Sequence, residues 1–262
     1  MRNLSAMVVA VVVMGLAAGQ AAAQLSFTED FEGLTNGTLN GQNGWVADAN
    51  LIVDGGSGFA SAKGAKSSNS GNFTATRPLG TTVTGGLYTA SGLISPSCGS
   101  CQKGGSIFFS DGGSNFLEVE VLGGSGTVSK FNLKSAAGIQ STSAPFPAGL
   151  VHANGGSGAI SDFNDAGFVQ VEINYNVGAG TATATLRDVL DFEGRPTSFG
   201  PDVMTQSFNA FTQFNVTTAG FRVNRPTTNG GDMDDLVFAV PEPATAMLLG
   251  LGGLVLLRRR AA

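Results

Sequence analysis

The 262-residue sequence predicts an all-β protein, an antiparallel sandwich of two sheets, with an N-terminal signal helix and a short apolar C-terminal helix. Two observations indicate the sheets. Apolar and polar residues alternate along several short segments, and clusters drawn from 39 glycines separate those segments. No segment between Gln24 and Ala239 has sustained helical periodicity. Alternation with one polar face is typical of antiparallel sheets that bury one side.

The first residues have the form of a secretory signal peptide. Arg2 precedes an uncharged apolar run from Ala6 to Ala18, and the small residues that follow offer a cleavage site before Gln24. The run is shorter than the about 20 apolar residues that span a bilayer. We therefore expect residues 1–23 to be a cleaved signal peptide, with an uncleaved anchor as the alternative.

The clearest strands form a hairpin in the second half of the chain. Residues alternate from Val169 to Tyr175, the turn Val177–Gly180 follows, and Thr181–Leu186 alternates again. Shorter strands are expected at Ile107–Phe109, Leu117–Val121, Phe221–Val223 and Leu236–Phe238. Most of the 18 phenylalanines fall in or beside these strands and predict the core.

Two stretches rich in glycine and serine interrupt this pattern. We expect residues 55–72 and 143–165 to be long surface loops, and the second is long enough for a functional loop.

The charge of the chain without Arg2 and its three C-terminal arginines restricts its partners. Leaving out Arg2 and the three terminal arginines reduces 14 basic residues to 10, against 19 acidic ones, a net charge of −9. Without a basic patch to neutralise phosphates, nucleic acid is excluded as a partner. An acidic surface of low charge density, rich in Gly, Ser, Thr and Asn, fits secreted proteins that contact carbohydrate or cations.

The two cysteines, Cys98 and Cys101, lie in one Cys-Gly-Ser-Cys segment. In an oxidising periplasm they predict a local disulfide that ties one loop. A redox pair is the alternative, but it requires a βαβ context that the sequence lacks. A zinc site would require two further ligands, and His152 is the only histidine.

The C-terminus has three parts in order. Val240, Pro241, Glu242 and Pro243 are followed by an apolar segment that ends at Leu257, and then by Arg258, Arg259 and Arg260. The prolines hold the backbone extended. The 14 residues from Ala244 to Leu257 would make a helix of about 21 Å. A hydrocarbon core is about 30 Å thick, so the length favours a transient membrane stop over a permanent anchor.

These three parts resemble the PEP-CTERM sorting signal, and the resemblance covers residues 240–262. The resemblance implies recognition by an exosortase, a membrane protease-transferase, at or near Glu242–Pro243. It also implies only transient contact with the membrane, and release to the cell surface or matrix of a Gram-negative, exopolysaccharide-producing bacterium. An ordinary single-pass tail anchor is the alternative.

Residues 24–239 resemble the concanavalin A-like (laminin G-like) β-sandwich. The resemblance rests on the opening segment Asp30–Trp45, the closing segment Met233–Phe238 and the hairpin between them. It implies a jelly-roll topology in which the first and last strands pair, with Trp45 packed under the first strand. Trp45, Tyr88 and Tyr175 are the aromatic side chains that could stack on sugar rings if exposed, and we expect Trp45 in the core.

One strand offers candidate catalytic carboxylates. Laminarinase-type glycoside hydrolases share this sandwich and place three carboxylates as Glu-x-Asp-x-x-Glu on one strand. Glu118 and Glu120 fill the first two positions and point to the same face, but Gly123 occupies the third. A solvated outer face explains the pair without catalysis, so no catalytic residue is assigned.

Acidic residues near both ends of the sandwich suggest a structural calcium, and no other cofactor is expected. Asp232, Asp234 and Asp235 precede the last strand, and calcium prefers such oxygen ligands. Sandwiches of the resembling family often hold calcium where their ends meet, which implies a site using Glu32 and Asp235. Acidic residues at a strand edge are the alternative.

These observations predict an exported surface or exopolysaccharide-matrix protein that is not an enzyme. We expect a carbohydrate-contacting or structural module, with an exosortase and extracellular polysaccharide as partners. The alternative is a laminarinase-type glycoside hydrolase that uses Glu118 and Glu120.

Overall fold

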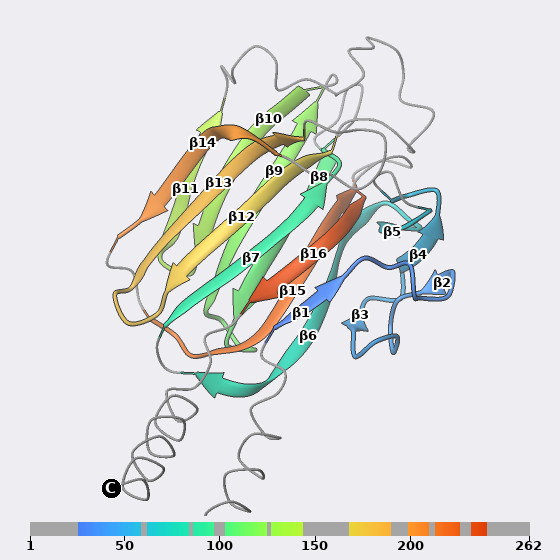
Figure 1. The fold of residues 1–262 in the computed structure, drawn as a ribbon, viewed down its shortest axis with the longest axis horizontal. Coiled ribbons are helices and arrows are strands. Elements are labelled where there is room, and N and C mark those ends of the chain that lie inside the picture. Colours follow the sequence, from blue (N-terminus) through green and yellow to red (C-terminus); the bar gives the residue numbers. More distant parts are fainter. Residues whose placement is uncertain are drawn as a thin grey trace, which may run out of the picture.

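The computed structural model describes residues 26–58, 62–83, 86–96, 103–124, 127–143, 168–189, 199–209, 213–225 and 232–239. These residues form sixteen strands (Figure 1). The predicted terminal helices, both cysteines, His152 and the sorting residues 240–262 lie outside the described part. Among the described residues, no helix has the length and apolar character needed to cross a membrane.

The strands form two antiparallel sheets, which confirms the predicted all-β sandwich. The larger sheet has nine strands. Eight of them lie in the order β14 (Phe199–Phe208), β13 (Thr181–Val189), β12 (Val169–Asn176), β7 (Leu87–Ile94), β16 (Met233–Ala239), β5 (Lys63–Ser67), β4 (Leu51–Gly55) and β2 (Gly37–Thr38). The ninth strand, β1 (Phe27–Glu29), pairs with β16. The smaller sheet has seven, in the order β11 (Gly138–Ser143), β10 (Thr127–Ser135), β9 (Phe116–Gly124), β8 (Lys103–Ser110), β15 (Val216–Arg225), β6 (Gly71–Val83) and β3 (Val46–Ala47).

The predicted hairpin is confirmed as β12 and β13, which pair antiparallel from Val169 opposite Asp188 to Asn176 opposite Thr181. Along β12 every odd residue is buried, from Val169 to Tyr175, and the even residues are less buried. The period of two therefore reflects one face of the sheet against the core and one against solvent.

The core lies between the sheets and is rich in aromatic rings. Trp45 packs edge-on against Phe221 of the smaller sheet, with ring centroids 5.2 Å apart, and against Phe27 of the larger sheet at 5.8 Å. Trp45 is only 1% exposed, which confirms its predicted place in the core.

The first and last strands pair as predicted. In β1 and β16, Phe27 lies opposite Phe238 and Glu29 opposite Leu236. The other edge of β16 pairs with β7, so the last strand of the sandwich is internal to its sheet. Removing β16 would therefore leave strand edges on both sides unpaired and take the buried side chains of Met233, Leu236 and Phe238 out of the core.

A bulge at Asp235 sets which residues of β16 face the core. The register against β7 shifts between Asp234 and Val237, and Asp235 has a φ of 45°. The extra residue reverses the alternation, so that Met233 and Leu236, three positions apart, both join the core.

The expectation of one long loop over residues 55–72 was wrong. This stretch contains β5 and the start of β6. β5 has the sequence KGAKS and lacks the branched residues that mark strands, but it pairs along its whole length with β4 and through Ala65 with Met233. Its partners in the fold decide its conformation.

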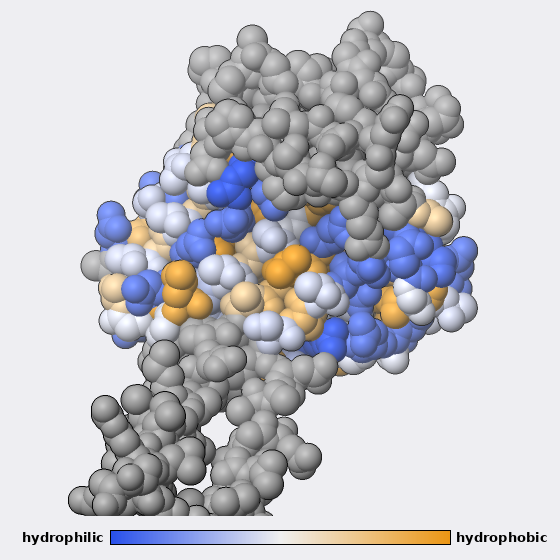
Figure 2. All heavy atoms as spheres, viewed as in Figure 1, coloured by the Kyte–Doolittle hydropathy of each residue, from blue (hydrophilic) through white to orange (hydrophobic). Residues whose placement is uncertain are grey.

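The visible face of the molecule is mainly polar. Figure 2 shows apolar residues scattered over it, while hydrophilic residues gather at the right, over the region of β2 to β5. The large apolar side chains that are exposed include Val46, Leu87, Ile139 and Val237.

Candidate functional site

A buried carboxylate ties the first strand to the segment that follows it. Glu29, at the end of β1, is 4% exposed. Its Oε1 accepts a hydrogen bond from the Phe31 amide at 3.0 Å. Its Oε2 accepts one from Asn43 Nδ2 at 2.8 Å and one from Trp45 Nε1 at 3.0 Å. Both oxygens are thus occupied by neutral donors, which fixes the turn that carries Asn43.

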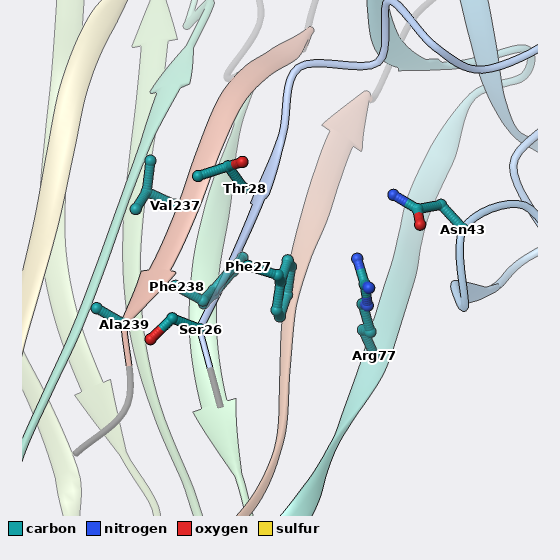
Figure 3. A pocket seen from close by; sticks show the side chains of 8 residues that line it. All are labelled: Ser26, Phe27, Thr28, Asn43, Arg77, Val237, Phe238 and Ala239. Atoms are coloured by element: carbon teal, nitrogen blue, oxygen red, sulfur yellow. The ribbon is translucent and has the colours of Figure 1, made fainter. Parts of the chain in front are cut away.

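A recess of about 390 Å³ opens beside this network, between β1 of the larger sheet and β6 of the smaller one. Figure 3 shows its lining side chains: Ser26, Phe27, Thr28, Asn43, Arg77, Val237, Phe238 and Ala239. We call it the β1–β6 recess. Its walls combine an aromatic ring, a cation, an amide and two hydroxyl groups.

Arg77 covers the aromatic ring of the β1–β6 recess. The guanidinium carbon lies 4.3 Å from the centroid of the Phe27 ring, a cation–π contact. The Phe27 ring is itself held from behind by Phe238, with centroids 4.8 Å apart in a stacked arrangement. The ring is therefore an anchor for the guanidinium, and its covered face is closed to other groups.

A second recess, of about 370 Å³, lies on the other side of β1. Its lining includes Asp30, Ser91, Gln170 and Asp235, but Glu32 is not among its lining residues. Glu32 faces β5, where its Oε1 accepts a hydrogen bond from the Lys63 amide at 2.8 Å. Glu32 and Asp235 therefore do not both line this recess, and a calcium site that uses them stays a prediction.

The surroundings of Glu32 are unfavourable for a cation. The Lys63 ammonium donates to the Glu32 carbonyl at 3.0 Å and to the Leu34 carbonyl at 2.6 Å, so a positive charge already occupies this position. Within the described ranges, no group of three or more His, Cys, Asp or Glu side chains is arranged to hold a metal ion.

Glu118 and Glu120 lie on the outer face of the smaller sheet, as alternation predicts. Each is held by a cation. Arg222 Nη1 donates to Glu118 Oε1 at 2.8 Å, and the Lys134 ammonium lies 2.6 Å from Glu120 Oε2. Glu118 also accepts a hydrogen bond from the Ser106 hydroxyl. Both carboxylates thus belong to ion pairs between strands: Glu120 pairs with the adjacent β10, and Glu118 reaches across β8 to β15.

The position of the missing third carboxylate has no room for a side chain. A Cβ on Gly123 would lie 1.4 Å from the Pro96 carbonyl oxygen. β9 also pairs with β8 without a register shift, so Gly123 faces the opposite side from Glu118 and Glu120. The tertiary structure thereby excludes the third carboxylate of the laminarinase pattern.

The three aromatic residues considered for sugar stacking are all buried. Trp45 is 1% exposed, and Tyr88 and Tyr175 are 0% exposed. The Tyr175 hydroxyl instead accepts a hydrogen bond from the Phe214 amide at 3.3 Å, and its ring stacks on the Phe214 ring. A stacking platform built from these three side chains is excluded.

Sequence reasoning did not identify Phe27 and Arg77, because only the pairing of β1 with β16 and the position of β6 bring them together.

Comparisons with known proteins identify the C-terminal segment. Residues 239–261 match the family model described as the PEP-CTERM protein-sorting motif. The match begins at the last residue of β16 and confirms the predicted motif. The chain is therefore an exported protein that is sorted at the membrane. More particularly, it is a two-sheet β-sandwich that ends in a PEP-CTERM sorting motif.

A search for similar curated proteins found no match to the chain. Among solved structures, it is similar to a Bacillus licheniformis beta-glucanase, with 9% identity, a TM-score of 0.44, and 82% of this chain and 98% of that chain covered. It is also similar to a legume lectin-like domain from Entamoeba histolytica, with 6% identity, a TM-score of 0.42, and coverage of 86% and 93%. A sialidase has 12% identity and a TM-score of 0.42; the alignment covers 82% of this chain but only 18% of the sialidase.

These similar structures include sandwiches of the concanavalin A-like class that the sequence predicted. TM-scores below 0.5 at such low identities indicate nothing about a ligand or a reaction of this chain.

Proposed function

We propose that this chain is a non-catalytic, carbohydrate-contacting module of the cell surface or its exopolysaccharide matrix, delivered there by an exosortase that recognises Pro241–Pro243. The main observation in support of the proposal is the position at which the β-sandwich gives way to the sorting motif. The last described strand of the sandwich ends at Ala239, and the sorting motif begins at that residue. Cleavage near Glu242 would therefore release the sandwich without removing any residue of its core.

Two features of the sandwich support a binding role over a catalytic one. The β1–β6 recess offers hydroxyl, amide and guanidinium groups, which are the groups that recognise sugar hydroxyls and acids. Glu118 and Glu120 are paired with Arg222 and Lys134, and Gly123 stands where the laminarinase pattern has its third carboxylate.

The sorting step is tested by the mass of the protein at the cell surface. We expect a chain that begins at Gln24 and ends near Glu242. Replacing both Pro241 and Pro243 with alanine should abolish release, whereas the exposed Pro78→Ala in β6 is the matched control and should leave release unchanged. If the protein at the cell surface retains Ala262, the sorting proposal is wrong and the C-terminal segment is a tail anchor.

The binding role is tested on an array of polysaccharides with the full chain, exported by the host cell and purified in neutral detergent. We expect binding without any shortening of the bound glycan, and the same result for Glu118→Gln. Shortening of a β-glucan that Glu118→Gln abolishes would establish the hydrolase instead.

A further inference from the structure

We propose that the β1–β6 recess binds the carboxylate of an acidic sugar, a uronic acid unit of a polysaccharide, through the guanidinium of Arg77. The proposal rests on the proposed function, which supplies carbohydrate as the ligand, and adds its chemical class and its site.

Arg77 differs from the other arginines whose side chains the structure describes. Arg187 donates to Glu172 at 2.9 Å and to Gln170 at 3.2 Å. Arg222 donates to Glu118 at 2.8 Å and to Thr74 at 3.3 Å. Arg77 makes no hydrogen bond or ion pair with a described residue, and its Nη1 is buried without a partner.

A buried guanidinium nitrogen without a partner requires an explanation. Leaving such a donor unsatisfied costs about 1–3 kcal/mol, and more for a charged group. The carboxylate in β1, that of Glu29, accepts hydrogen bonds from the Phe31 amide, Asn43 and Trp45 rather than from Arg77. Arg77 is thus not a counterion of a described residue, and because its side chain lines the recess, its guanidinium can receive an acceptor from outside the chain.

The recess holds the guanidinium ready for such an acceptor. Phe27 supports its face at 4.3 Å, and Phe27 in turn packs between Phe238 and Trp45. Figure 3 shows Phe27 on one side of Arg77 and Asn43 on the other. Since little side-chain freedom remains to be lost on binding, this arrangement favours affinity.

The chemistry of the lining favours an acidic sugar. The planar guanidinium matches a carboxylate with two parallel hydrogen bonds. Asn43 gives a hydrogen from Nδ2 to Glu29, which leaves its Oδ1 as an acceptor for a sugar hydroxyl, and the hydroxyls of Ser26 and Thr28 line the same recess. Its volume of about 390 Å³ lies in the range of about 300–1,000 Å³ typical of ligand pockets.

The cation–π contact argues against recognition of neutral sugars by stacking. Arg77 already covers a face of Phe27, one of the two aromatic rings that line the recess, and the other, Phe238, stacks on Phe27, so the charge of the ligand has to supply the selectivity. The net charge of −9, counted without Arg2 and the three C-terminal arginines, repels polyanions at long range, but at about 0.15 M salt the screening length is only about 8 Å. At that salt concentration the local contact with Arg77 decides binding.

The test compares two ligands that differ only in the carboxylate. The full chain, exported by the host cell and purified in neutral detergent, is titrated with oligogalacturonate and with the same oligosaccharide after its carboxylates are reduced to alcohols. We expect the reduced ligand to bind at least about tenfold more weakly.

The matched variants remove one positive charge at two places. Arg77→Gln should weaken oligogalacturonate binding at least about tenfold, while Arg187→Gln, on the outer face of the larger sheet, should leave it unchanged. Arg77→Lys keeps the charge but loses the paired donors, so it should bind more weakly than the native chain. If Arg77→Gln does not fold, as judged by Trp45 fluorescence, the binding of oligogalacturonate by Arg77→Lys tests the proposal instead.

The outcomes separate this inference from the proposed function. Equal binding of oligogalacturonate by the native chain and Arg77→Gln would overturn the site. If neutral oligosaccharides bind and Arg77 has no effect, the inference fails and the carbohydrate role stands. If neither ligand binds, and the polysaccharide array is also negative, both fail. Equally tight, Arg77-dependent binding of a polyglutamate peptide would overturn the assignment to a sugar.

Discussion

The indole Nε1 of Trp45 donates a hydrogen bond of 3.0 Å to Glu29 Oε2, and both side chains are buried. This bond connects the end of β1 to the segment before β3, and the same carboxylate also receives the Phe31 amide and Asn43. One charged group thus organises the corner where the first strand leaves the larger sheet.

Replacing Glu29 should therefore destabilise the fold strongly. Glu29→Ala leaves three buried or partly buried donors without an acceptor, and we expect a loss of more than about 3 kcal/mol in the free energy of unfolding. Glu29→Gln retains one acceptor oxygen and should lose about 1–3 kcal/mol. Trp45 is the only tryptophan, so its fluorescence during urea unfolding reports this corner directly.

Glu172→Gln is the matched control for Glu29. Glu172 lies in a partly exposed ion pair with Arg187, and its loss should change the free energy of unfolding by less than about 1 kcal/mol. Similar losses for Glu29→Gln and Glu172→Gln would show that the buried network contributes no more than a surface ion pair.

Gly123 should tolerate no side chain. A Cβ there would lie 1.4 Å from the Pro96 carbonyl oxygen, so Gly123→Ala should cost at least about 3 kcal/mol or prevent folding. Gly33→Ala is the control, because a Cβ at Gly33 meets nothing within 4 Å, and its effect should stay within about 0.5 kcal/mol.

The same contact predicts the result of restoring the third carboxylate. Gly123→Glu should give a protein that fails to fold rather than a glucan hydrolase. A folded Gly123→Glu variant, with a native melting curve, would contradict the packing of β9 against Pro96.

Alkaline pH should weaken the fold through Tyr175. Burial raises the pKa of the Tyr175 phenol above its ordinary value of 10.0, and the hydrogen bond with the Phe214 backbone opposes this rise. Because the folded state keeps the proton that the unfolded state releases, this contribution to stability is present below pH 10 and is lost as pH rises through the pKa of the folded state.

The chain has two tyrosines, so Tyr88→Phe leaves Tyr175 as the only phenol. In this variant we expect tyrosinate absorbance to appear at a higher pH in the folded protein than in urea. Coincident titration curves in the two conditions would show that Tyr175 is not shielded from solvent.

Chelation of calcium should leave thermal stability unchanged. Glu32 already accepts a hydrogen bond from the Lys63 amide, and Asp235 lines a recess that does not include Glu32. We expect the melting temperature to shift by less than about 2 °C after dialysis against a chelator, which corresponds to less than about 1 kcal/mol. A larger fall that added calcium reverses, and that Asp235→Asn reproduces, would establish a calcium site at Asp235.

The sequence by itself determined the features that depend on local pattern. Alternation from Val169 to Tyr175 requires one buried face, and the hairpin to β13 follows from the turn between them. The sorting motif was equally readable, because its prolines, apolar segment and arginines are contiguous.

Only the tertiary structure decided the features that depend on distant partners. β5 is a strand because β4 and Met233 offer it hydrogen bonds, although its residues lack strand propensity. Gly123 faces inward against Pro96 because β8 and β9 pair without a shift. Arg77 and Phe27, fifty residues apart in the sequence, meet because the fold brings β6 of the smaller sheet beside β1 of the larger one. Local alternation fixes the face of each strand, but contacts between sheets depend on the register and order of all strands together.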